Sequence, residues 1–165
     1  MAEKNIIKVA VEIVIEADPS RVFKAITTGT AIWWSAPHLQ RQSANDLVME
    51  PKIGGRFYER WTISHHDTCG ALHATVTAID PPKLLRLQGP FGMTERAAWG
   101  TASIELKGIK DGTHVHFSYH AFGELDEAIE VEYSRGWADL LGRLKFFVEE
   151  GKAEGIRQDP SLTLD

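Results

Sequence analysis

The feature that most constrains the fold is a stretch near the end of the chain, from Glu127 to Glu150, which reads EAIEVEYSRGWADLLGRLKFFVEE. Apolar residues recur in it at helical spacing and form one face, which comprises Tyr133, Trp137, Leu140, Leu141, Leu144, Phe147 and Val148. Asp126 is suited to cap the first turn, and Gly151 stands where a left-handed C-cap residue belongs. The sequence therefore predicts one long amphipathic helix, which must bury its apolar face against another element.

The rest of the chain has the pattern of β-strands joined by short turns. Residues 6–16 alternate between apolar and mostly polar side chains, as expected for a strand with one buried face. Asp18 and Pro19 suit the start of a short helix, and a second short helix or turn is predicted over residues 31–35. Further strands are predicted at residues 47–50, 56–63, 69–79, 84–88, 97–107 and 114–122. Short turns favour antiparallel pairing, so we expect an α+β fold in which a curved antiparallel sheet wraps around the long helix.

Composition narrows the class of protein. The chain has 165 residues, which we interpret as a single domain over residues 1–151 and a polar tail over residues 152–165. The formal net charge is -5 and no basic patch is present, which argues against nucleic-acid and membrane-surface partners. Cys69 is the sole cysteine and no signal peptide or membrane-spanning stretch is evident, so a cytoplasmic protein is expected. Glycine-rich nucleotide motifs are absent, so no cofactor is expected.

Four short motifs resemble those of a known family. They are ADPSRVFKAI at residues 17–26 with WW at 33–34, IGGRF at 53–57, DPPKL at 80–84 and GWADLL at 136–141. Their order on the predicted elements resembles the helix-grip fold of the START-like (SRPBCC) superfamily, which has two short helices after the first strand. Within that superfamily the motifs are similar to those of the homologues of the activator of heat-shock-protein-90 ATPase.

The resemblance implies a cavity between the sheet and the long helix that takes a hydrophobic or amphipathic small molecule, such as a lipid. It does not imply one activity, because ligand carriers, polyketide cyclases and co-chaperones share the fold. Chaperone-activating members carry an additional N-terminal domain to which nothing here corresponds, so a chaperone partner is not expected. We expect the loops at residues 37–46 and 89–96 to gate the cavity, and a homodimer is a further expectation.

Aromatic side chains are the first candidates for the cavity wall, and the tryptophans among them are Trp34, Trp61, Trp99 and Trp137. Trp137 lies on the apolar face of the predicted helix, together with Tyr133 and Leu141. Trp99 lies opposite a stripe of small residues around Gly100, and that stripe either leaves room under the helix or allows the helix to pack closely.

One predicted strand places an acid among apolar residues. Phe57, Glu59 and Trp61 share a face that is mostly apolar and therefore directed inward. Burial raises the pKa of a carboxyl group unless a cation or donor compensates, so Glu59 is the leading candidate for a general acid, a general base or a ligand hydrogen bond. The alternatives are an ion pair with a basic neighbour and a strand edge where Glu59 reaches water. His73 is a similar candidate, and its facing depends on whether Gly70 introduces a bulge.

The last predicted strand has two different faces. Phe117 and Tyr119 share the apolar face, where Tyr119 either orients a ligand or is a core residue whose hydroxyl reaches solvent or backbone. The opposite face carries His114, His116 and His120. These histidines, and His65-His66-Asp67 at a hairpin tip, have the chemistry of metal ligands, but their placement favours solvated surfaces, so no metal site is expected.

These observations leave three functions open. The leading one is the binding of a hydrophobic or amphipathic small molecule in the cavity, with Glu59 or Tyr119 setting its orientation. The second is an enzyme of cyclase or hydrolase type that uses Glu59 with Tyr119 or His73. The third is a protein-interaction module that resembles a chaperone activator.

Overall fold

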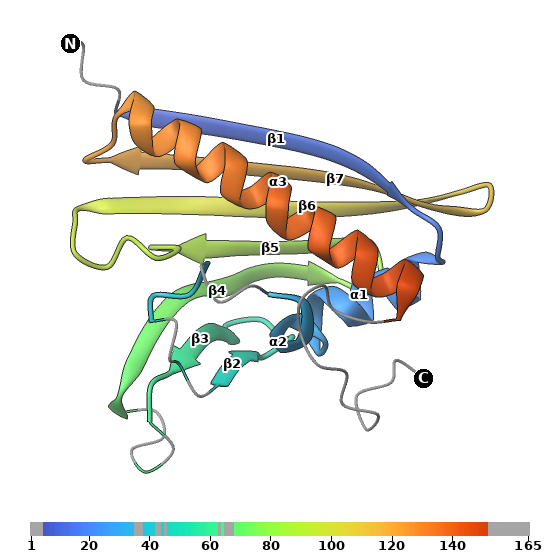
Figure 1. The fold of residues 1–165 in the computed structure, drawn as a ribbon, viewed down its shortest axis with the longest axis horizontal. Coiled ribbons are helices and arrows are strands. Elements are labelled where there is room, and N and C mark those ends of the chain that lie inside the picture. Colours follow the sequence, from blue (N-terminus) through green and yellow to red (C-terminus); the bar gives the residue numbers. More distant parts are fainter. Residues whose placement is uncertain are drawn as a thin grey trace.

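A seven-stranded antiparallel sheet forms the body of the molecule, as a computed structural model shows for residues 5–34, 38–41, 44, 46–62, 64 and 68–151. The strand order is β1-β7-β6-β5-β4-β3-β2. The strands are β1 (Ile6–Ile15), β2 (Asp46–Met49), β3 (Arg56–Arg60), β4 (Gly70–Asp80), β5 (Leu84–Gly89), β6 (Ala98–Ile109) and β7 (Gly112–Gly123), and the helices are α1 (Pro19–Thr27), α2 (Thr30–Trp33) and α3 (Glu127–Glu150). Figure 1 shows α3 lying across one face of the curved sheet. The predicted helix-grip α+β fold, including two short helices after the first strand, is thereby confirmed.

Local sequence signals set the ends of the helices. The Asp18 carboxylate accepts a hydrogen bond from the backbone amide of Arg21 (3.0 Å) and begins α1. The Asp126 carboxylate accepts one from the amide of Ile129 (2.9 Å) and begins α3. Gly151, with φ of 72°, ends α3 in the left-handed conformation that glycine adopts without strain. These caps fix where α3 lies along the sheet.

Several boundaries differ from the predictions. β3 ends at Arg60, earlier than the predicted strand over residues 56–63, whose residue 63 lies outside the described part of the chain. β6 and β7 each extend to the tight turn around Asp111, which has φ of 62°. The predicted tail, residues 152–165, lies outside the described residues as well.

Aromatic side chains fill most of the space between the sheet and α3. The ring of Phe117 lies 4.6 Å from the ring of Trp137, and the ring of Tyr119 lies 5.5 Å from it (centroid distances). An added Cβ at Gly100 would lie 2.5 Å from Cε2 of Tyr119, so the small stripe on β6 makes room for this tyrosine. A void of only about 30 Å³ is left beside Phe117 and Leu141. Among the described residues, the space between the sheet and α3 is thus a packed core with a small void, and the larger open space lies elsewhere.

None of the helices in the described part of the chain is long and apolar enough to cross a membrane.

Candidate functional site

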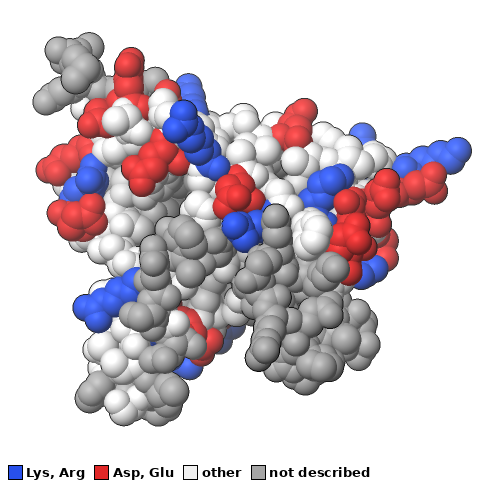
Figure 2. Space-filling view, in the orientation of Figure 1, with Lys and Arg blue, Asp and Glu red and all other residues white. Residues whose placement is uncertain are grey.

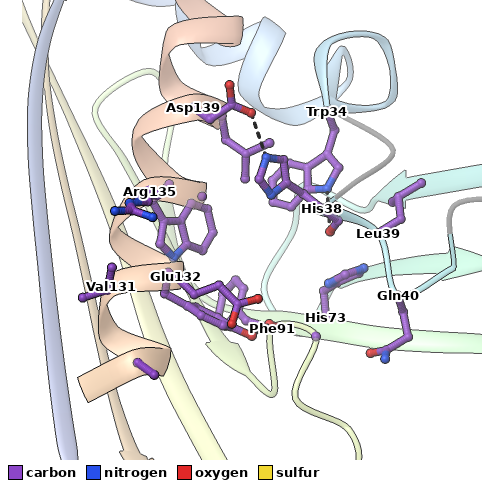
Figure 3. A pocket seen from close by; sticks show the side chains of 16 residues that line it. Trp34, His38, Leu39, Gln40, His73, Phe91, Val131, Glu132, Arg135 and Asp139 are labelled. Atoms are coloured by element: carbon purple, nitrogen blue, oxygen red, sulfur yellow. Dashed lines mark hydrogen bonds and ion pairs between the residues drawn. The ribbon is translucent and has the colours of Figure 1, made fainter. Parts of the chain in front are cut away.

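An open cleft of about 640 Å³ lies along the first half of α3 (Figure 3). The helix forms one side of the cleft, residues 38–40 form the opposite side, and the loop after β5 closes one end at Phe91 and Gly92. Its volume is within the range of ordinary small-molecule sites, which is roughly 300–1,000 Å³. The side chains in it are both apolar and charged, as the lining shows: Trp34, His38, Leu39, Gln40, His73, Phe91, Val131, Glu132, Tyr133, Arg135, Trp137, Asp139 and Leu140.

Three aromatic rings separate this cleft from the interior of the molecule. Trp34 meets Trp137 edge-on with ring centroids 5.9 Å apart, and Phe91 meets Trp137 edge-on at 5.7 Å. All three rings line both the cleft and the small interior void. Such contacts are favourable beyond the area they bury. The rings therefore form an apolar wall against which a ligand of the cleft would pack.

The loop after β5 is held in place on both sides of the cleft. Phe91 has φ of 45°, an unusual value for a residue other than glycine. Its amide donates to the carbonyl of His73 (2.9 Å), and its carbonyl accepts from the Tyr133 hydroxyl of α3 (2.7 Å). The Thr94 hydroxyl donates to Oε1 of Gln40 (3.3 Å) across the cleft mouth. The described parts of the two loops predicted to gate a cavity thus flank this cleft and contact each other.

Glu59 lies behind the cleft and is completely buried. Its Oε1 accepts hydrogen bonds from the amide of Arg41 (2.8 Å) and from Nε1 of Trp61 (2.7 Å). Its Oε2 accepts from the amide of Gln40 (2.8 Å) and is 2.8 Å from Nε2 of His73. One carboxylate on β3 therefore holds both the segment at residues 40–41 and the histidine of the neighbouring strand.

The electrostatic state of Glu59 follows from these contacts. Burial alone raises the pKa of its carboxyl group, but hydrogen bonds from His73 and Trp61 and from the amides of Gln40 and Arg41 outweigh burial, and the pKa is lowered. Glu59 does not reach water at a strand edge, and donors that compensate for its burial are present. Glu59 is therefore an anion whose two oxygens accept hydrogen bonds from protein donors. The side chain of this pair that lines the cleft is that of His73.

His73 faces inward, which settles the facing that the sequence left open. The nearby register shift lies between Phe57 and Tyr58 of β3, and not at Gly70. The imidazole lies 5.0 Å from the ring of Phe57 and 6.2 Å from that of Trp34 (centroid distances). In Figure 3 the His73 side chain lies across the cleft from α3. His73 is thus a polar group in an aromatic surrounding.

Charged groups line the rim of the cleft. Nε2 of His38 lies 2.8 Å from the Asp139 carboxylate, which also accepts from Nε of Arg143 (3.0 Å). Burial raises the pKa of Asp139, but the hydrogen bonds from His38 and Arg143 outweigh it and the pKa is lowered. Glu132 and Arg135 are exposed on the same rim. Figure 2 shows further acidic side chains gathered over the start of α3, where Glu127 and Glu130 stand.

Tyr119 is fully buried, and its hydroxyl is one of two buried side-chain polar atoms without a hydrogen-bond partner in the described chain. Its ring stacks on that of Tyr133 at 5.6 Å and meets Phe91 edge-on at 5.3 Å. Burial, and after it the neighbouring Tyr133, raise the pKa of the Tyr119 hydroxyl. If Tyr119 were a core residue, we expected its hydroxyl to reach solvent or a backbone group. In the described structure it reaches neither.

The predicted site residues fall into several groups. Those that line the cleft are Trp34, His73, Tyr133 and Trp137, and those that line the small interior void include Phe57, Phe117 and Leu141. Trp61 supports Glu59 from behind. Trp99 is 43% exposed and lies beside Phe122 on the outer face of the sheet, so it does not line the space under α3. The reason is the alternation along β6, which directs Gly100 inward and its neighbour outward.

Sequence reasoning missed the residues that the loops contribute. His38, Leu39 and Phe91 line the cleft, but no periodic pattern marks loop residues. The sequence Gly89-Pro90-Phe91-Gly92 does indicate a tight turn there, and Gly92 has φ of 87°.

The three histidines of β7 lie on the outer face, as predicted. Nδ1 of His116 is 2.9 Å from the Glu12 carboxylate, and Nε2 of His114 is 3.9 Å from it. Within the described ranges, no group of three or more histidine, cysteine or acidic side chains is placed to hold a metal ion. The tip at residues 65–67 lies outside those ranges.

Solved structures from bacteria share this architecture. A solution structure of an Aha1 dimer from Colwellia psychrerythraea is 22% identical, covers 89% of this chain and 99% of that chain, and has a TM-score of 0.62. A structure from Rhizobium leguminosarum is 21% identical over 88% and 95% of the two chains, with a TM-score of 0.66. One from Staphylococcus saprophyticus is 16% identical over 92% and 96%, with a TM-score of 0.61. At such identities the likeness shows a common fold.

The family comparison is more specific. No curated protein matches the sequence at a significant level. The family model described as "Activator of Hsp90 ATPase homolog 1-like protein" matches residues 16–149. This range includes the four sequence motifs and every residue that lines the cleft. The chain therefore belongs to the family of Activator of Hsp90 ATPase homolog 1-like proteins.

Proposed function

We propose that this protein binds an amphipathic small molecule in the cleft beside α3. The observation that carries the proposal is the combination, in one cleft of about 640 Å³, of an aromatic wall and a charged rim. The apolar part of the ligand would pack on Trp34, Phe91 and Trp137. Its polar part would face Arg135 and Glu132 at the rim. Membership of a fold family whose members often bind hydrophobic ligands supports the same function.

The site proposed for the ligand differs from the one expected from sequence. The expected cavity lay directly between the sheet and α3, where a void of only about 30 Å³ remains. That volume is far below the roughly 300–1,000 Å³ of ordinary small-molecule sites. A drug-sized ligand therefore fits the lateral cleft, and not the interior in this conformation.

Titration with 8-anilino-1-naphthalenesulfonate tests the proposal, because this probe joins aromatic rings to an anionic group. The wild-type protein should bind one probe molecule with a fluorescence increase. Trp137→Leu removes the central ring of the wall and should weaken binding about tenfold, since burying an aromatic side chain contributes roughly 1.5–3 kcal/mol.

Trp99→Leu is the matched control, because the same substitution is made on the outer face of the sheet. It should leave probe affinity unchanged. Thermal unfolding of both variants checks that each is folded at the titration temperature. Absence of binding to the wild-type protein, or a larger loss in Trp99→Leu than in Trp137→Leu, would show that the cleft is not the binding site.

We also infer that the protein is a cytoplasmic homodimer. The sole cysteine supports the location. The relative from Colwellia psychrerythraea is described as a dimer, which supports the assembly. Light scattering on the purified protein would measure the assembly directly, and a monomeric mass at micromolar concentration would contradict it.

A further inference from the structure

His73, which lines the cleft, has one ring nitrogen bound to the protein and one for which the described residues supply no hydrogen-bond partner. Nε2 lies 2.8 Å from Oε2 of Glu59, and Glu59 is the sole hydrogen-bond partner of this ring among the residues described. An ionised carboxylate can only accept hydrogen bonds, so the proton of this contact lies on Nε2 of His73. In the neutral ring Nδ1 is then left with a lone pair.

The remaining contacts of Glu59 keep this arrangement in place. Three further donors, on Trp61, Gln40 and Arg41, occupy the other acceptor positions of the carboxylate. Glu59 has no exposed surface, so water cannot replace His73 as its partner without a change in structure. The ring orientation and the tautomer of His73 are therefore set by a carboxylate that is itself fixed.

We propose, resting on the proposed function, that His73 is the ligand-binding hydrogen-bond acceptor of the cleft and that the ligand class is an aromatic compound with a weakly acidic hydroxyl group, a phenol or an enol. The ring surface of such a compound matches Trp34, Phe91 and Trp137. Its hydroxyl donates to Nδ1 of His73. If the proton moves, the O–H bond breaks and an N–H bond forms, which leaves an oxyanion beside an imidazolium whose Nε2 lies 2.8 Å from Oε2 of Glu59.

A pair of probes isolates the hydroxyl group. 2-Naphthol and 2-methoxynaphthalene have the same ring system, but the ether has no proton to donate. Quenching of tryptophan fluorescence measures both affinities. The wild-type protein should bind the naphthol about fivefold more tightly than the ether, which is the effect of one net hydrogen bond.

His73→Lys is the test variant, because a lysine ammonium group can still donate to Glu59 but has no lone pair with which to accept a hydrogen bond. It should bind the ether as the wild-type protein does and should lose the preference for the naphthol. His120→Lys, at an exposed histidine on the outer face of β7, is the matched control and should keep the preference. A preference that survives in His73→Lys would overturn the proposal.

A second measurement needs no variant. In the wild-type protein, the nitrogen-15 resonance of Nδ1 of His73 should shift on addition of 2-naphthol and not on addition of the ether. No shift at saturating naphthol would overturn the proposal. Equal binding of both probes, or binding of anilinonaphthalenesulfonate without either naphthalene, would overturn it too but would leave the proposed function standing. Failure of all three probes would overturn both.

Discussion

At the scale of single residues, the two tyrosines beside the cleft have opposite environments. The Tyr133 hydroxyl donates to the carbonyl of Phe91, whereas the Tyr119 hydroxyl has no partner in the described structure. A buried hydroxyl without a hydrogen bond has lost its hydrogen bonds to water, and no protein partner replaces them, so it destabilises the folded state. The two rings stack on each other, so the effects of substituting Tyr119 and Tyr133 are compared within the same packing environment.

This contrast predicts different effects of the same substitution. Tyr119→Phe should leave the free energy of unfolding unchanged or raise it by about 1 kcal/mol, because it removes an unpaired polar atom. Tyr133→Phe should lower it by about 1 kcal/mol, because it breaks a hydrogen bond. Urea unfolding of both variants measures the difference. Destabilisation by Tyr119→Phe equal to that by Tyr133→Phe would mean that the Tyr119 hydroxyl has a partner.

At the scale of elements, the sequence predicted the helices and strands whose apolar residues recur periodically, and it missed the loop residues, which follow no period. The period of α3 and the alternation of β1 and β7 identify buried faces correctly, because each buried side chain recurs at a fixed interval. The cleft depends instead on loop residues such as His38 and Phe91, and on a bulge that brings His73 to Glu59. Those depend on long-range packing, which a periodic pattern does not encode.

The start of α3 is the element on which the cleft most directly depends, because the first half of the helix lines it. Asp126→Ala removes the capping hydrogen bond to Ile129 and should lower the free energy of unfolding by about 1 kcal/mol. Amide hydrogen exchange should rise in the first turn of the helix. Glu127→Ala is the control, since the neighbouring acid does not cap the helix. Equal losses in both variants would show that the cap contributes nothing of its own.

At the scale of the whole molecule, Glu59 joins parts of the chain that are distant in sequence. It holds the segment at residues 40–41, the strand that carries His73, and Trp61 beyond the end of β3. Arg41 also lies over the ring of Trp61, with its guanidinium carbon 3.8 Å from the ring centroid. One side of the cleft therefore depends on a single buried anion, and the stability of that side must depend on the charge of this carboxylate.

The pH dependence of folding follows from the sign of the pKa shift. The pKa of Glu59 is lower in the folded protein than its ordinary value of 4.5, so the folded state favours the charged form. Its contribution to stability is fully present above pH 4.5 and is lost as the pH falls through the folded pKa. Glu59→Gln should cost about 2 kcal/mol or more at pH 7, because donors then face an amide group.

The stability difference between the wild-type protein and Glu59→Gln should therefore shrink as the pH falls below 4.5, since protonation neutralises the wild-type carboxylate too. Urea unfolding at a series of pH values measures this difference. Glu105→Gln, at a side chain that is 59% exposed, should show a small difference at every pH. The stability difference between the wild-type protein and Glu59→Gln could instead stay constant from pH 7 to acidic pH. That result would mean that the shape of the Glu59 side chain, and not its charge, stabilises this side of the cleft.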